Sequence, residues 1–141
     1  MDIQLDWMAI AIITLISFFF GAAWHGKFFF GRLWMRIHHG KDDFTEAEMK
    51  KAMEGMWKNM LAEFISTLFM IMTLDFLTKI ISGYSPLHIA FMVWLGFVLP
   101  TMTSTVVWGG DKREWMVTKI LISASFRLIS LLLAGYILSI W

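Results

Sequence analysis

A single charged residue, Arg127, lies near the middle of the hydrophobic run from Trp115 to Ile140, and it constrains the fold more than any other feature. A run of this length predicts a membrane-crossing helix, because about 20 apolar residues span the hydrocarbon core. A charged side chain at the bilayer centre costs at least ~2.5–3.5 kcal/mol. Arg127 is therefore expected to face water or a partner of opposite charge. Glu63 and Asp75, inside another apolar run, are the candidate partners.

The composition also indicates a membrane protein. Of the 141 residues, 58% are hydrophobic, whereas soluble domains are typically about 45–50% apolar. The length allows about four spans of ~20 residues with short connections. We therefore expect one all-α domain over residues 1–141, a polytopic membrane protein with four transmembrane helices in a bundle.

Several functions are excluded by the residues that are missing. The chain has no cysteine, so disulfides, thiolate metal sites and iron–sulfur clusters are ruled out. A net charge of +1 argues against nucleic-acid binding. No phosphate-binding glycine loop, nucleophile elbow or zinc-protease motif is present. His38 and His39 lie near Asp42 and Asp43, but a solvated polar loop is the commoner interpretation of such a cluster. We expect no enzyme, no catalytic residue, no cofactor and no metal.

The hydrophobic runs predict spans over residues of about 3–26, 57–81, 87–107 and 115–140. The first is expected to be a retained span, because Asp2 and Asp6 precede it and because it is longer than a usual signal core. Pro100 lies inside the third span. It is expected to kink that helix or to free a carbonyl, which the neighbouring Thr and Ser side chains can satisfy.

The segment between the first two spans is basic and amphipathic. Its cations Lys27, Arg32 and Arg36 alternate with bulky apolar residues. This pattern predicts a cytoplasmic segment at the headgroup layer, attracted to anionic lipid. Farther along, Thr45 and Glu48 have the spacing of a capping box, so a helix is expected to begin there and to continue into the second span.

The distribution of Lys and Arg predicts the orientation, since these residues concentrate in cytoplasmic loops. The basic residues of the first loop are Lys27, Arg32, Arg36, Lys41, Lys50, Lys51 and Lys58, and those of the third are Lys112 and Arg113. The N-terminus, second loop and C-terminus have almost none. Both termini are therefore expected outside a bacterial cytoplasmic (inner) membrane.

The depths of the buried charges suggest which of them pair. Spans two and four would run in the same direction and rise ~1.5 Å per residue. Glu63 would lie ~9 Å and Asp75 ~27 Å from the start of span two. Lys119 would lie ~6 Å and Arg127 ~18 Å from the start of span four. These depths favour Glu63–Lys119 and Asp75–Arg127 pairs, with Glu63–Arg127 as the competing arrangement.

Span four has a polar face at helical spacing, formed by Lys119, Ser123, Arg127 and Ser130. Such a face must meet protein or water rather than lipid. With Glu63 and Asp75 it makes a predicted intramembrane charged network. Two interpretations stay open. The network fixes helix register as buried ion pairs, or it forms a pathway for protons, ions or a polar solute.

One histidine beside the basic segment is a weaker candidate. His25 ends the first span, next to Lys27. Its imidazole can titrate near neutral pH, although an ordinary interfacial side chain is the more common role.

A resemblance to a known family rests on two blocks of sequence. Residues 21–34 read Gly-Ala-Ala-Trp-His-Gly-Lys-Phe-Phe-Phe-Gly-Arg-Leu-Trp, and a second block follows at 94–108. Together they resemble the signature of a family of small bacterial membrane proteins classed as a domain of unknown function. The resemblance implies four spans but no activity, and it singles out Trp24, Gly31, Arg32, Trp34, Trp94, Gly96, Phe97, Thr101 and Trp108. The chain differs from the signature at His25 and Lys27, where the family usually has Tyr and often Pro.

Two hypotheses for the function follow. The first is a homo-oligomeric transport or permeation protein, because four spans are few to enclose a solute path. Its coupling carboxylates would be Glu63 and Asp75, with Arg127 as their counter-ion. The alternative is an accessory or assembly subunit of a larger membrane complex, with no catalytic role of its own. Met faces suited to adaptable packing favour it.

Overall fold

Every regular element in the described part of the chain is a helix. The computed structural model describes residues 4–26, 29–40, 44–110 and 112–141. Its elements are α1 (Trp7–Trp24), α2 (Gly31–His39), α3 (Glu46–Met53), α4 (Met56–Ile80), α5 (Pro86–Val93), the π-helix η1 (Trp94–Val98), α6 (Leu99–Trp108) and α7 (Arg113–Ile140). Four helices are long and apolar enough to cross a membrane, namely α1, α4, the combined α5–η1–α6 helix and α7. The expected all-α architecture is confirmed.

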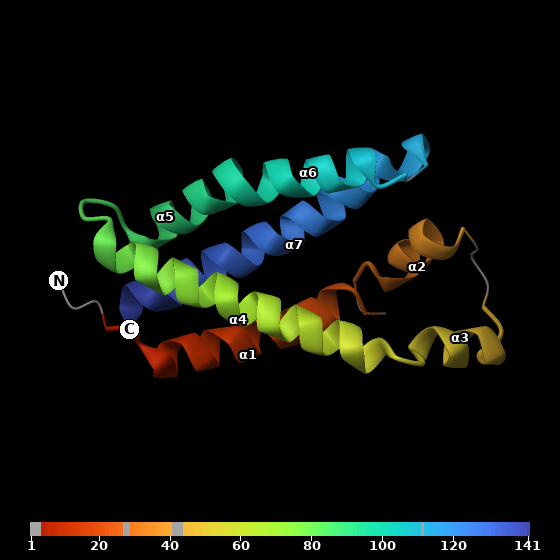
Figure 1. Ribbon diagram of the computed structural model, residues 1–141, viewed down its shortest axis with the longest axis horizontal. Helices are drawn as coiled ribbons and strands as arrows, with labels where there is room; N and C mark the ends of the chain where they lie inside the picture. The colour runs from red at the N-terminus through yellow and green to blue at the C-terminus, as the bar shows by residue number, and fades with distance from the viewer. Residues whose placement is uncertain (1–3, 27–28, 41–43, 111) are drawn as a thin grey trace.

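The four long helices lie in alternating directions (Figure 1). Helices α4 and α7 run one way, and α1 and α5–η1–α6 run the other way. The start of α1, the α4–α5 turn and the end of α7 therefore meet at one end of the bundle, which we call the terminal end. Helices α2 and α3 lie at the opposite end, which we call the α2 end.

The core lies toward the terminal end. Helix α7 packs against α1, α5 and α6, while α4 packs mainly against α1. Among the described residues, α4 makes contact with α5 but no extended contact with α6. The fully buried apolar cluster comes from α1, α4, α5 and α7 and consists of Ala9, Ile10, Ile13, Ile71, Leu74, Ile89, Ala90, Leu131 and Ala134. The bundle is consequently packed more tightly at the terminal end than at the α2 end.

Two glycines allow helices to approach α7 closely. A Cβ atom at Gly135 would lie 2.8 Å from the carbonyl oxygen of Pro86 and 3.0 Å from the Ala90 Cβ. A Cβ atom at Gly21 would lie 2.8 Å from the ring of Phe126. Such small residues are typical of membrane helix interfaces, where close backbone approach gives dispersion contact.

The third span departs from regular α geometry near Pro100. The π-helix η1 ends two residues before it, and the Leu99 N–H bonds to the Trp94 carbonyl, five residues back. Proline has no N–H to donate, so the preceding turn widens. Beyond it, the hydroxyl groups of Thr103 and Thr105 donate to carbonyls four residues back, at 2.8 and 2.9 Å.

The connection between the first two spans is only partly as predicted. Helix α2 is a separate helix in the predicted amphipathic segment. The capping box at the start of α3 is confirmed: Thr45 Oγ1 accepts from the Glu48 N–H, and the Glu48 carboxylate accepts from the Thr45 N–H. The prediction of one continuous helix from Thr45 into the second span is wrong. The helix is interrupted at Gly55, whose φ of +78° is a conformation that favours glycine.

Candidate functional site

A charged pair joins α4 and α7 inside the spans. Arg127 Nη2 donates to Glu63 Oε2 at 3.1 Å and makes an ion-pair contact with Glu63 Oε1 at 2.8 Å. The Oε1 atom is buried without a well-directed hydrogen bond among the described residues, so its contact with Arg127 is mainly electrostatic. This is the competing arrangement expected from the sequence.

The prediction that Asp75 pairs with Arg127 is wrong. Glu63 pairs with Arg127, whereas the depths favoured Lys119 as its partner. The physical reason is the direction of side chains, which lean toward the N-terminus of their own helix. Helices α4 and α7 run in the same direction (Figure 1). The Arg127 side chain therefore leans toward the level of Glu63 and away from that of Asp75.

The Glu63–Arg127 pair is incompletely covered. The Arg127 side chain is 19% exposed and that of Glu63 is 43% exposed. Glu63 lies about 10 Å along α4 from its first residue, within a helix able to cross a membrane. Lipid is a poor environment for either charge, so the exposed part of the pair is better suited to water or to another protein chain.

His25 lies near this pair, directly after the last residue of α1. Its Nδ1 is 3.1 Å from the Gly21 carbonyl oxygen. Its ring centroid is 4.9 Å from that of Trp34 and 5.1 Å from that of Phe126. Burial lowers the pKa of His25, the Gly21 contact opposes that shift, and the charges of Glu63 and Arg127 act in opposite directions. The imidazole is therefore neutral at neutral pH.

Tryptophans of the family signature hold α7 just before Arg127. The indole N–H of Trp24 donates to the Ile122 carbonyl at 3.2 Å. The indole N–H of Trp94 donates to the Ala124 carbonyl at 2.9 Å. These bonds come from α1 and η1, so two neighbouring helices fix the backbone of α7 within a turn and a half of the guanidinium.

The other signature residues fall into two groups. At Gly31 a Cβ atom would lie 2.5 Å from the Gly26 carbonyl oxygen, so only glycine fits where the chain folds back after α1. Trp34 is half-buried against His25. The other signature side chains and the Gly96 backbone lie on the surface, at Arg32, Gly96, Phe97, Thr101 and Trp108. The space beside Gly96 is open.

The polar face of α7 changes character along its length. Lys119 and Ser123 are half-buried, whereas Ser130 is fully buried. The hydroxyl groups of Ser130 and of Thr14 and Ser17 on α1 are buried with no hydrogen-bond partner in the described part of the chain. The polar face thus begins partly open at the α2 end and ends in buried hydroxyl groups.

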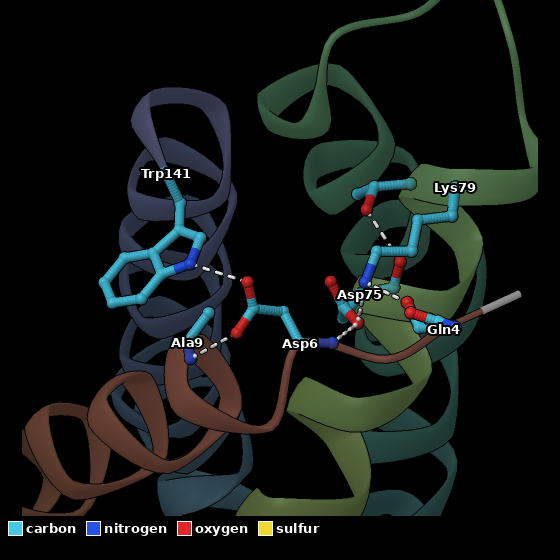
Figure 2. Close-up of polar contacts among 7 residues, drawn as sticks. Gln4, Asp6, Ala9, Asp75, Lys79 and Trp141 are labelled. Carbon is cyan, nitrogen blue, oxygen red and sulfur yellow. Dashed lines mark hydrogen bonds and ion pairs between the residues drawn. The ribbon is translucent and has the colours of Figure 1, made fainter.

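Asp75 belongs to a different group, at the terminal end. Its side chain is 2% exposed, and its Oδ2 is 2.7 Å from Lys79 Nζ. The same oxygen accepts the Asp6 N–H at 3.1 Å, and Lys79 also donates to the Gln4 carbonyl at 2.7 Å (Figure 2). The i,i+4 spacing of Asp75 and Lys79 is a sequence signal for this pair. It predicts the partner of Asp75 correctly, whereas the comparison of depths does not.

Asp6 extends this group to the end of α7. Its carboxylate accepts the Ala9 N–H at 3.0 Å and the Trp141 indole N–H at 2.6 Å (Figure 2). The backbone bond from Ala9 lowers the pKa of Asp6 below its usual range, against a smaller opposing effect of burial. We call Gln4, Asp6, Asp75, Lys79 and Trp141 the terminal network. No feature of the sequence predicts the contact between Asp6 and Trp141.

Metal binding finds no support in the described ranges. They contain no group of three or more His, Cys, Asp or Glu side chains placed to hold an ion. Asp42 and Asp43, considered above with His38 and His39, lie outside the described residues.

Comparison with known proteins places the whole bundle in one family. No curated protein and no solved structure matches this chain. A family model does match, from residue 8 to residue 139, and so covers nearly all of the four long helices, including the Glu63–Arg127 and Asp75–Lys79 pairs. This chain therefore belongs to the family described as "Protein of unknown function (DUF1761)".

Proposed function

We propose that this protein carries protons or small ions across a membrane as a homo-oligomer, along a polar path that includes the Glu63–Arg127 pair. The supporting observation is the 43% exposure of the Glu63 side chain on a helix suited to crossing a membrane. A charge at that depth meets water or protein, not lipid. A second copy over this side of α4 would cover the pair and complete a path that four spans are too few to enclose.

The polar side chains on either side of the pair support the same proposal. Lys119 and Ser123 continue the polar face of α7 toward the α2 end. In the opposite direction, Ser130, Thr14 and Ser17 present buried hydroxyl groups that are unpartnered among the described residues. A hydroxyl group can both donate and accept, so these groups can bond to a passing water or ion.

Asp75 has a structural role in this proposal. Its charge is neutralised by Lys79, and its Oδ2 accepts a second hydrogen bond from the backbone of Asp6. Such a satisfied, buried carboxylate fixes the ends of helices. Of the two carboxylates in α4, Glu63 is the coupling group.

The direct test is flux into liposomes that contain the purified protein. Glu63→Gln should abolish proton or ion flux, whereas Glu54→Gln, an equal change at an exposed site outside the spans, should leave it unchanged. Because Glu63→Gln leaves Arg127 unpaired, the Glu63→Gln/Arg127→Gln double variant guards against misfolding. Wild-type flux in the folded double variant would refute the proposal.

The second copy is tested by cross-linking, since the chain has no cysteine of its own. Ser66 is exposed and lies one turn beyond Glu63 on α4. Ser66→Cys should form a disulfide-linked dimer on mild oxidation in native membranes. Ser104→Cys, exposed on α6, is the matched control and should stay monomeric.

The accessory-subunit alternative has one observation in its favour. Helix α3 makes no extended contact with any other described helix, and its Met49 and Met53 side chains are exposed. Such Met surfaces suit adaptable protein contacts. Native mass spectrometry after gentle extraction separates the two proposals. A homodimer alone supports the flux proposal, and co-isolation with larger subunits supports the alternative.

We further propose that the α2 end faces the cytoplasm of a bacterial inner membrane, with both termini outside. Arg32 and Arg36 on α2 are exposed and suit anionic headgroups, while Lys27 lies outside the described residues. Labelling of single cysteines by an impermeant reagent in intact cells tests this orientation. Ser82→Cys in the α4–α5 turn should react, and His39→Cys should not.

A further inference from the structure

We infer that the species moved along this path is the proton, and that His25 is the group through which protons reach and leave Glu63 at the α2 end. This inference rests on the proposed function, because it adds a second group to the same path. The proposed function allows either protons or small ions to be carried, and this inference specifies protons.

The position of His25 is the first argument. It directly follows α1, so it lies at the end of a span, between the α2 end and the Glu63–Arg127 pair. Its ring contacts Trp34 of α2 on one side and Phe126 of α7 on another. The residue after Phe126 is Arg127 itself, whose guanidinium carbon is 5.2 Å from the Phe126 ring centroid.

The hydrogen bond to Gly21 fixes the tautomer of the ring. A carbonyl oxygen only accepts hydrogen bonds, so the contact of 3.1 Å means that Nδ1 carries the hydrogen. In the neutral ring Nε2 is then the acceptor. Contacts with Trp34 and Phe126 hold the ring plane, so the same nitrogen remains the proton acceptor in every cycle.

The charges around His25 suit reversible protonation. Glu63 on α4 raises the pKa of the imidazole, and Arg127 on α7 lowers it. The neighbour from α2, Trp34, is uncharged. Burial is the largest effect on the ring, and it outweighs the opposing Gly21 hydrogen bond, so the pKa of His25 lies below its ordinary value. A neutral ring can accept a proton and is not held in the charged form by a permanent partner.

The transfer balances within these groups. Nε2 takes a proton from water and the ring becomes imidazolium, with Nδ1–H still bonded to Gly21. The imidazolium then gives the Nε2 proton through intervening water to the Glu63 carboxylate. The carboxylate becomes a neutral acid, and the ring returns to its starting tautomer. Arg127 loses its ionised partner for that interval, which favours onward release of the proton from Glu63.

The experiment measures proton uptake into liposomes with a pH-sensitive dye under an imposed potential. His25→Gln should slow uptake by about 100-fold, the lower end of the usual contribution of a proton-transfer group. His88→Gln, the same change at the far end of the bundle, is the control and should have no effect. Imidazole added to the medium should partly restore the rate of His25→Gln.

A pH profile provides a readout that a merely structural role of His25 would not move. In the unaltered protein the uptake rate should change with a midpoint below the usual histidine value of 6.5, because burial lowers the pKa. That midpoint should disappear in His25→Gln. The profile of the unaltered protein requires no variant, so it remains informative if His25→Gln folds poorly.

The outcomes separate the inference from the proposed function. If Glu63→Gln abolishes uptake while His25→Gln keeps the wild-type rate and pH profile, the relay is wrong and the proposed function stands. If sodium or potassium ions cross as fast as protons, the assignment of the proton is wrong. If neither substitution changes flux of any ion, both are wrong.

Discussion

Removing the charge of Asp75 should loosen the terminal end of the bundle. Asp75→Asn replaces a carboxylate whose Oδ2 binds Lys79 Nζ at 2.7 Å and the Asp6 N–H at 3.1 Å. The amide has nearly the same shape, so little packing is lost. Its effect reports on charge and hydrogen bonding in the terminal network.

The magnitude follows from the burial of the two partners. Leaving one member of a buried ion pair alone costs about 3–5 kcal/mol when both are sealed from water. The Asp75 side chain is 2% exposed, but that of Lys79 is 33% exposed and can recover part of its hydration. We therefore expect a loss of about 2–3 kcal/mol, between the surface and buried limits.

The assay is reversible unfolding in mixed micelles, followed by circular dichroism. Lys79→Met removes the other charge, and the Asp75→Asn/Lys79→Met double variant completes a thermodynamic cycle. The double variant leaves no charge unpaired. Its loss of stability should therefore be about 1–2 kcal/mol smaller than the sum of the losses in the two single variants. A change below about 0.5 kcal/mol for Asp75→Asn, the range of ordinary surface substitutions, would refute this account of the terminal network.

Three further predictions concern packing, a hydrogen bond and pH. Gly135→Ala should lower stability by about 1–3 kcal/mol, because the added Cβ would lie 2.8 Å from a backbone atom. Gly96→Ala adds a Cβ in open space and should not lower stability. Thermal unfolding of the two variants tests this difference. Trp94→Phe should cost about 1 kcal/mol by losing its bond to a carbonyl of α7, and Trp108→Phe, at a side chain 86% exposed, should be neutral in the same assay. The lowered pKa of Asp6 means that its stabilisation is present above the usual carboxyl value of 3.8 and is lost as pH falls through the lower folded value. Acid titration of Asp6→Asn should accordingly show a shallower loss of stability, and an unchanged slope would contradict this.

The long helices could be predicted because membrane crossing depends on length and apolarity, both properties of the sequence alone. The predicted fourth span begins two residues after the start of α7. The break at Gly55 was missed for a local reason. A capping box predicts where a helix begins but says nothing of where it ends, and a lone glycine inside a helical pattern is often tolerated.

The pairing of charges was harder to predict than their presence. Depth along a helix axis locates the Cα atoms only, whereas Arg and Lys side chains extend several ångströms and lean one way. That lean brings Arg127 to Glu63 and Lys79 to Asp75. The bonds from Trp24 and Trp94 to carbonyls of α7 depend on which helices are neighbours, and no periodicity in the chain specifies this.

The π-helix η1 has a consequence for how the third span should be compared with other sequences. A π-turn takes up one residue more than an α-turn, so it rotates all later residues by about 100° around the helix axis. Helices α5 and α6 therefore have separate phases, with Ala90 buried in the first and Val106 in the second. Deleting one residue between Trp94 and Val98 should convert the π-turn into an ordinary α-turn and leave the buried face of α6 in place. A relative with a one-residue gap there would keep the same buried faces in α5 and α6 and would lack only the wide turn between them.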